Sequence, residues 1–118
     1  MNLLEETKQK LAEYGKTLED VVWIGTSEYK VDVEKFIELA DVEYDGGYGS
    51  AKVATNLLVV GKDFWLERHE YDGSEWWEYK SLPKEPNQWL DLSALTVGQS
   101  KYDVSVGWET LEKLNGIK

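Results

Sequence analysis

The chain has 118 residues and a formal net charge of −10, from 23 acidic residues against 13 basic ones. It contains no cysteine, which excludes a disulfide framework, a thiolate nucleophile and a cysteine-ligated metal centre. The negative charge and the single arginine argue against direct binding of nucleic acid or of anionic membrane, because Lys and Arg carry those contacts.

The N-terminal segment gives no sign of export. It is charged from Glu5 onward and lacks the basic start and apolar run of a secretion signal. No stretch of the chain approaches the ~20 apolar residues of a spanning helix. We therefore expect a cytoplasmic protein that forms a single domain over residues 1–118.

The first predicted element is an amphipathic helix over residues 2–14. Asn2 is suited to cap its N-terminus, and Gly15 stands where a helix-ending glycine belongs. Glu6 and Lys10 have the spacing of an i,i+4 ion pair. A short apolar strand is predicted next, over residues 21–24.

The following segment changes its periodicity from strand to helix. Residues 29–33 alternate as a strand does, and apolar residues then recur at helical spacing over 33–41, with Asp32 as the expected N-cap. After a Gly-rich loop we expect a short helix over 51–56 and a buried strand over 57–60.

A β-hairpin is predicted over residues 63–81, with its turn at Asp72-Gly73. It holds the only Arg, the only His and three of the six Trp. A two-residue turn pairs Arg68 with Trp77 and places both on the face of Phe64, Leu66 and Tyr79. A three-residue loop that includes Ser74 instead pairs Arg68 with Glu78. Both registers remain open, because a slip of one residue exchanges the faces of one strand.

The C-terminal segment resembles an earlier one. Residues 95–106, LTVGQSKYDVSV, match the pattern of residues 22–33, VWIGTSEYKVDV. Two strand–turn–strand–helix units, 21–41 and 94–115, would then flank the central hairpin. Duplication and independent hairpin patterning are both open, and each predicts the same local structure, with a helix over 108–115.

These elements predict an α+β fold. Hairpins form a short antiparallel sheet, and the helices over 2–14, 33–41 and 108–115 pack mainly on one face. Each hairpin face carries large aromatic side chains, more than so short a sheet covers by itself. Either helices cover one face and a loop covers the other, or part of the aromatic surface is exposed, and an exposed patch would be an interaction site. The candidate binding residues are Trp65, Arg68, His69, Tyr71, Trp76 and Trp77.

No catalytic motif accompanies these residues. His69 is the lone histidine, without the nucleophile pattern of a triad and without a Cys or second His to build a metal site; a mixed site with the nearby carboxylates is only weakly indicated. The segment 41–46 begins like a calcium loop, but Lys52 stands where the bidentate Glu is required. We expect a non-enzymatic protein with no cofactor and no metal.

Two stretches carry a resemblance to a known group of proteins: DVEYDGGYGSAKVATNLLVVG and WLERHEYDGSEWWEYK. Over residues 17–83 the chain resembles small uncharacterised proteins encoded by phages and prophages of Gram-positive bacteria. The resemblance implies an accessory protein that binds and modulates or inhibits a host or defence protein, as anti-CRISPR proteins do. With a charge of −10, the expected partner surface is basic.

Two alternatives remain open. In one, the aromatic hairpin is a small-ligand module that stacks a nucleotide or sugar, in a concave pocket lined by Trp65, Trp76 or Trp77. In the other, the protein is a structural phage component that acts through self-association. The sequence leaves the oligomeric state open.

Overall fold

The structure is a computed structural model that describes residues 1–47, 49–104 and 107–117. The chain divides into two compact units, Met1–Pro83 and Lys84–Lys118, called unit 1 and unit 2 below. Packing defines these units, whereas independent folding defines a domain. The prediction of a single domain over 1–118 therefore stays a prediction.

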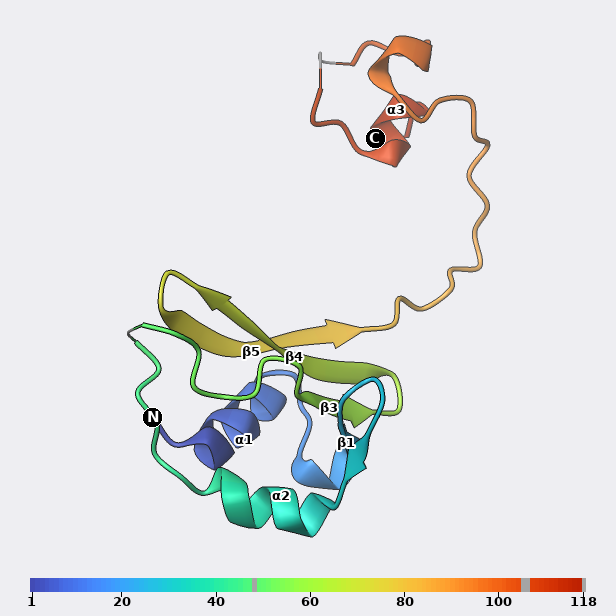
Figure 1. Ribbon diagram of the computed structural model, residues 1–118. Helices are drawn as coiled ribbons and strands as arrows, with labels where there is room; N and C mark the ends of the chain where they lie inside the picture. The colour runs from blue at the N-terminus through green and yellow to red at the C-terminus, as the bar shows by residue number, and fades with distance from the viewer. Residues whose placement is uncertain (48, 105–106, 118) are drawn as a thin grey trace. The chain divides into compact units, whose positions relative to one another are not determined.

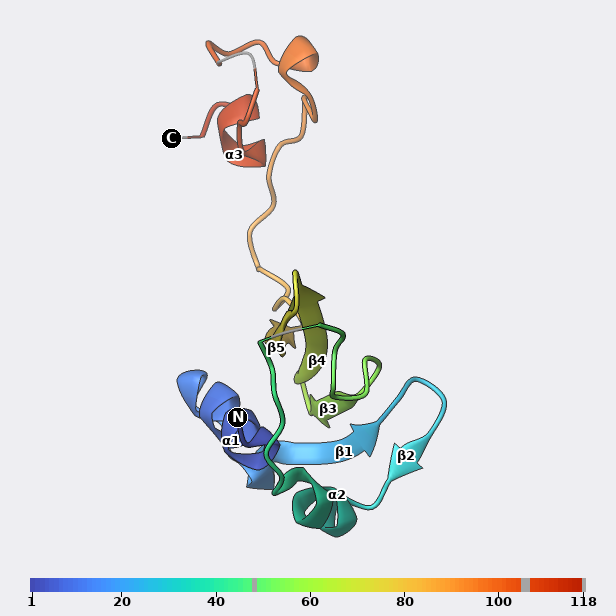
Figure 2. The ribbon, with the colours of Figure 1, turned by 60° about the vertical axis from the view of Figure 1, so that its left-hand side comes forward.

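Unit 1 is a five-stranded antiparallel sheet with two helices on one side (Figures 1 and 2). Helix α1 packs against β5 and helix α2 against β1, so the predicted α+β fold with helices mainly on one face is confirmed. The strand order is β2-β1-β3-β4-β5, which leaves β2 and β5 at the edges. The elements are α1 (Leu3–Glu13), a 3₁₀ turn (Leu18–Asp20), β1 (Val21–Gly25), β2 (Lys30–Val31), α2 (Val33–Ala40), β3 (Leu58–Gly61), β4 (Phe64–Tyr71) and β5 (Ser74–Ser81).

Local signals set the ends of α1 as predicted. The Asn2 side chain accepts a hydrogen bond from the Glu5 amide at 3.0 Å, and Gly15 ends the helix with a φ of 72°. The predicted pair between Glu6 and Lys10 is wrong. Lys10 pairs with Glu13, and Glu6 instead binds a side chain on the sheet, as described below.

Two elements after β1 differ from the expected ones. The strand predicted over residues 29–33 is reduced to β2, because Asp32 accepts from the Lys35 amide and starts α2 there. The helix predicted over 51–56 does not form. The amides of Lys52 and Val53 bond to the carboxylate of Glu75, a partner that local sequence does not reveal.

The hairpin β4–β5 adopts the two-residue turn. Asp72 and Gly73 have φ of 50° and 85°, as a type I′ turn requires. Arg68 lies opposite Trp77, and the three-residue alternative is excluded. The core lies between this sheet and the helices, where Ile24, Val59 and Leu66 are fully buried in one row across β1, β3 and β4.

Unit 2 contains little regular structure. Its elements are a 3₁₀ turn (Val97–Gln99) and α3 (Leu111–Leu114), which is shorter than the helix predicted over 108–115. The strand–turn–strand predicted within 94–106 is absent from residues 94–104, since no neighbouring strand pairs with them in the described part of unit 2. Residues 105 and 106 of that prediction lie outside the described residues.

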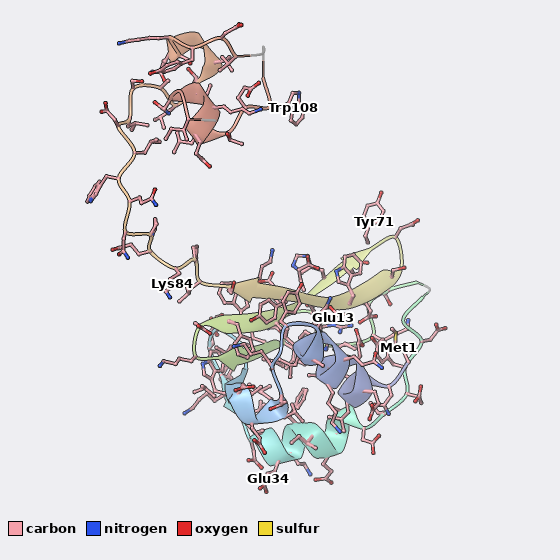
Figure 3. All side chains as sticks on the ribbon, turned by 180° about the vertical axis from the view of Figure 1, so that it is seen from behind. Met1, Glu13, Glu34, Tyr71, Lys84 and Trp108 are labelled. Carbon is pink, nitrogen blue, oxygen red and sulfur yellow. The ribbon has the colours of Figure 1, made fainter. Side chains whose placement is uncertain are left out.

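The Asn115 side chain organises unit 2. Its oxygen accepts from the amides of Ser93 and Ala94 and from the Ser93 hydroxyl. Its nitrogen donates to the carbonyls of Ala94 and Leu111. The buried side-chain amide of Asn115 thus joins residues 93–94 to α3. Trp89 and Trp108 remain fully exposed, and Figure 3 shows Trp108 pointing away from the rest of the unit.

Among the described residues, no helix combines the length and apolar character needed to cross a membrane.

Candidate functional site

The β4–β5 hairpin divides its unusual side chains between two faces, because successive residues of a strand point to opposite sides. Arg68 and Trp77 lie with Leu66 on the face that the helices cover, called the inner face here. The opposite face is called the outer face. From the strand register it carries Trp23, Leu58, Val60, Trp65, Glu67, His69, Tyr71, Trp76, Glu78 and Lys80.

On the inner face, Arg68 is the centre of a buried ion network. Its side chain is only 3% exposed, and its two terminal nitrogens lie 3.1 Å from Glu6 and 2.9 Å from Glu75. It also donates to the Tyr44 hydroxyl at 3.3 Å, and that hydroxyl donates in turn to Glu6. The guanidinium carbon lies 4.8 Å from the centre of the Trp77 ring, the stacking that the two-residue register predicts.

Glu75 links this network to residues 52–53, in the segment where the helix predicted over 51–56 does not form. Its carboxylate accepts from the amides of Lys52 and Val53, at 2.7 and 3.1 Å. Burial raises the pKa of Glu75, but these amides and the Arg68 guanidinium outweigh that effect and lower it. Burial, followed by the hydrogen bond to Glu6, raises the pKa of Tyr44 to about 12. The network therefore holds Glu75 as a charged carboxylate and Tyr44 as a neutral phenol at neutral pH.

Trp77 is 1% exposed, and its indole nitrogen donates to the Thr7 hydroxyl at 2.9 Å. The structure thus places Arg68 and Trp77, two of the six candidate binding residues, in the core. They hold α1 and the 52–53 segment to the sheet, and a partner cannot reach them without unfolding. Both side chains therefore serve the packing of unit 1.

The outer face brings together the other four candidates. Trp65, His69 and Trp76 are half-buried, and Tyr71 is 77% exposed at the hairpin tip, where Figure 3 shows it pointing away from the sheet. His69 lies directly opposite Trp76, with ring centres 6.4 Å apart. Neither helix covers this face in the described part of unit 1 (Figures 1 and 2).

Two carboxylates fix the outer aromatic rings. The Trp65 indole donates to Glu67 and the Trp76 indole to Glu78, both at 2.7 Å. The imidazole of His69 lies 2.8 Å from the second oxygen of Glu67. The hydrogen bonds from Trp65 and His69 lower the pKa of Glu67, so this carboxylate is charged at neutral pH. The result is a set of oriented aromatic rings with negative charges between them.

Sequence reasoning missed one outer-face aromatic and three inner-face partners. Trp23 lies in the same row as Val60 and Trp65. A register shift between Val21 and Trp23, which alternation in the sequence does not reveal, sets its face. Glu6, Thr7 and Tyr44 carry no local signal for their contacts with the hairpin, since each is more than twenty positions from its partner.

A concave site exists in unit 1, but it lies elsewhere. An apolar groove of about 440 Å³ runs between α2 and residues 52–57, over the start of α1. None of Trp65, Trp76 and Trp77 lines it, so the small-ligand alternative does not find its expected pocket there. The lining residues are Leu3, Val31, Asp32, Lys35, Phe36, Leu39, Ala40, Val42, Tyr44, Lys52, Val53, Ala54 and Leu57.

Within residues 1–47, 49–104 and 107–117, no three Asp, Glu or His side chains come together in a group able to hold a metal ion. The outer face offers apolar ring surface, carboxylates held by hydrogen bonds and one imidazole, which are groups suited to recognition. No protein-family model, curated protein or solved structure matches this chain.

Proposed function

We propose that this is a non-enzymatic accessory protein of phage type, which binds and modulates a host or defence protein through the outer face of its sheet. The observation that carries the proposal is the outer face itself. It presents Trp23, Trp65 and Trp76 on one side of a sheet whose helices pack on the other side.

The rings of the outer face are ordered before any partner arrives. The indole nitrogens of Trp65 and Trp76 already bond to Glu67 and Glu78. Ordering a free side chain at an interface costs about 0.5–1.5 kcal/mol, and a pre-ordered ring avoids most of that cost. Trp is also among the residues that contribute most to binding energy in protein interfaces. These features support a protein–protein contact.

The charge of the chain supports a basic partner. Glu67 and Glu78 place negative charge between the rings, and the whole chain has a net charge of −10. Such a field speeds encounter with a positive surface and repels nucleic acid. A nucleic-acid-binding groove on a defence protein has the complementary charge, so a protein of this kind would act by occupying that groove.

The surroundings of His69 support a role in binding. Its imidazole is bonded to Glu67 and lies beside Trp76, and no Ser, Thr or Tyr hydroxyl is bonded to it among the described residues. A general base requires a nucleophile within hydrogen-bond reach. The proposal therefore assigns His69 to the recognition surface.

The test is capture of partners from a lysate of Gram-positive bacteria, with the wild-type chain and a Trp65→Ala/Trp76→Ala variant as baits. We expect the double variant to lose the specific partner while its circular dichroism spectrum is retained. Trp89→Ala is the matched control, since Trp89 is 98% exposed and lies in unit 2. Loss of the partner with Trp89→Ala, together with retention by the double variant, would contradict the assignment to the outer face.

A second measurement tests the charge. With the purified partner, Glu67→Gln/Glu78→Gln should slow association, and salt should slow the wild-type association toward that of the variant. An association rate that neither the substitutions nor ~1 M salt changes would contradict a basic partner surface.

A further inference from the structure

A second surface of unit 1, separate from the outer face, has the features of a ligand site. This is the apolar groove between α2 and residues 52–57, with a volume of about 440 Å³. That volume falls in the range of sites for small organic ligands, about 300–1,000 Å³. Its floor is formed by buried Leu3, Phe36 and Ala40 from the two helices.

The walls of the groove are apolar and in contact with water. Leu39 is 63% exposed, Val42 is 50% exposed and Val31 is 46% exposed. Single exposed apolar residues are ordinary, but a continuous group around a hollow marks a binding surface. The groove is thus open along one side, so a bound molecule would keep one end in water.

Two lysines give the groove a charge opposite to that of the chain. Lys35 and Lys52 line it, against a single acid, Asp32. The Asp32 carboxylate is already engaged as the cap of α2. Lys35 has only a loose, exposed contact with Glu38 at 3.6 Å, and no ion pair involves Lys52 among the described residues.

We propose that the groove binds an amphiphile with an unbranched apolar chain and one carboxylate headgroup. The chain covers the floor of Leu3, Phe36 and Ala40, and the headgroup stays at the opening, where Lys35 and Lys52 attract it. This site is independent of the outer face, because none of the outer-face residues lines the groove.

The test compares dodecanoate with dodecylammonium, each below its micelle concentration, by titration calorimetry. The two probes have the same chain and opposite headgroups. Non-specific attraction to a chain of net charge −10 favours the ammonium. The proposal expects one molecule of dodecanoate per chain, bound about threefold or more tighter than dodecylammonium. No saturable dodecanoate binding, or a preference for the ammonium, would overturn it.

Charge variants locate the headgroup. Lys35→Glu/Lys52→Glu should abolish or reverse the preference for dodecanoate. Lys62→Glu/Lys84→Glu makes the same change in net charge at two exposed lysines outside the groove, so it should keep the preference. If both double variants behave alike, the headgroup is not at Lys35 and Lys52 and the proposal fails.

Steric variants locate the chain. Ala54→Phe places a ring at an exposed wall of the groove and should abolish binding of both probes, as should Leu39→Glu, which puts a charge in the apolar wall. Asn56→Phe adds the same ring two positions away from Ala54, outside the groove, and should leave binding unchanged. Thermal unfolding confirms that each variant is folded. Wild-type affinity in folded Ala54→Phe and Leu39→Glu would overturn the proposal.

Discussion

The inner and outer faces of the β4–β5 hairpin use similar side chains for different purposes. Each face has a tryptophan whose indole donates a hydrogen bond, and each has a carboxylate that accepts a hydrogen bond from a neighbouring side chain. On the inner face, Trp77 and Glu75 are almost fully buried. On the outer face, Trp76 and Glu78 keep contact with water. The surroundings, and not the residue types, decide which face stabilises the fold.

This difference follows from what can replace a lost partner. A buried polar group that loses its hydrogen bond has no water to turn to, and the cost of burying it is then uncompensated. A half-exposed group takes a water molecule in place of the lost partner. Matched substitutions on the two faces should therefore differ in their effect on stability, although they are adjacent in sequence.

The largest difference is expected for the two adjacent tryptophans. Trp77→Ala should lower the free energy of unfolding by about 3–5 kcal/mol, because it empties a fully buried site under α1. Trp76→Ala should cost about 1 kcal/mol, since its ring already contacts water. Urea unfolding followed by far-ultraviolet circular dichroism measures both. Similar losses for the two variants would contradict the division into faces.

The next largest difference in stability is expected between substitutions of Arg68 and of its neighbour His69. Arg68→Ala leaves Glu6 and Glu75 without their cation, and should cost about 3–5 kcal/mol. His69→Ala should lower the free energy of unfolding by less than about 1 kcal/mol. The imidazole has one hydrogen-bond partner among the described residues, Glu67, and that carboxylate stays solvated when the imidazole is removed.

A triple variant separates the lost charge from the lost packing. Arg68→Ala/Glu6→Gln/Glu75→Gln loses the same packing as Arg68→Ala but leaves no uncompensated charge, so it should be more stable than Arg68→Ala. If it is equally unstable, the packing of Arg68 on Trp77 accounts for the loss, and the ion network does not.

A smaller difference is expected for the indole hydrogen bonds alone. Thr7→Val keeps the shape of the side chain but removes the acceptor for Trp77, and should cost about 1–3 kcal/mol. Glu78→Ala removes the acceptor for Trp76, where water can replace it, and should cost less than about 0.5 kcal/mol. Thermal and urea unfolding of the two variants provide the comparison.

The smallest differences in the free energy of unfolding are expected at acid pH. The pKa of Glu75 is lower in the folded chain than its ordinary value of 4.5, so the unfolded chain takes up the proton first as the pH falls. The resulting stability is complete above about pH 5 and decreases as the pH drops toward the folded pKa. Glu75→Gln should be less stable at neutral pH and should lose less on acidification.

Acidification should act on Glu67 in the same direction as on Glu75, but with a smaller effect on the free energy of unfolding. Its pKa is also lowered, through the bonds from Trp65 and His69, but its side chain is 32% exposed and solvent screens the interaction. Glu67→Gln should therefore change the acid dependence of unfolding less than Glu75→Gln does. Urea midpoints measured at several pH values between about 3 and 7 test the order.

Features with local causes were predictable from the sequence. The Asn2 cap, the helical spacing of α2 and the Asp72-Gly73 turn each act within a few residues, and each gave the right element. The two registers of the hairpin could not be separated, because the choice depends on which face the helices cover. The hairpin and its aromatic residues could be predicted, but only the register shows that Arg68 and Trp77 are buried. Binding by the other four candidates stays a prediction.

Features with distant causes were not predictable. Two of the three side-chain partners of Arg68, Glu6 and Tyr44, lie 62 and 24 positions away, in α1 and in the loop after α2. Residues 51–56 have helix-compatible composition, yet the Glu75 carboxylate binds the amides of Lys52 and Val53, and the segment forms a bend and a turn instead of a helix. Residues 95–104 have strand-like alternation, but a strand needs a neighbour, and the described part of unit 2 supplies none.

The side-chain amide of Asn115 takes part in five hydrogen bonds of unit 2, so a chemical change of this one group would affect several contacts. Asn115 is followed by Gly116. In an Asn-Gly pair the glycine nitrogen readily attacks the side-chain carbonyl carbon, ammonia leaves, and water opens the resulting cyclic imide to give aspartate or isoaspartate. An aspartate at this position accepts hydrogen bonds but cannot donate to Ala94 and Leu111. Chemical ageing at Asn115 would therefore remove the two hydrogen bonds that its side-chain nitrogen donates and weaken the link between residues 93–94 and α3.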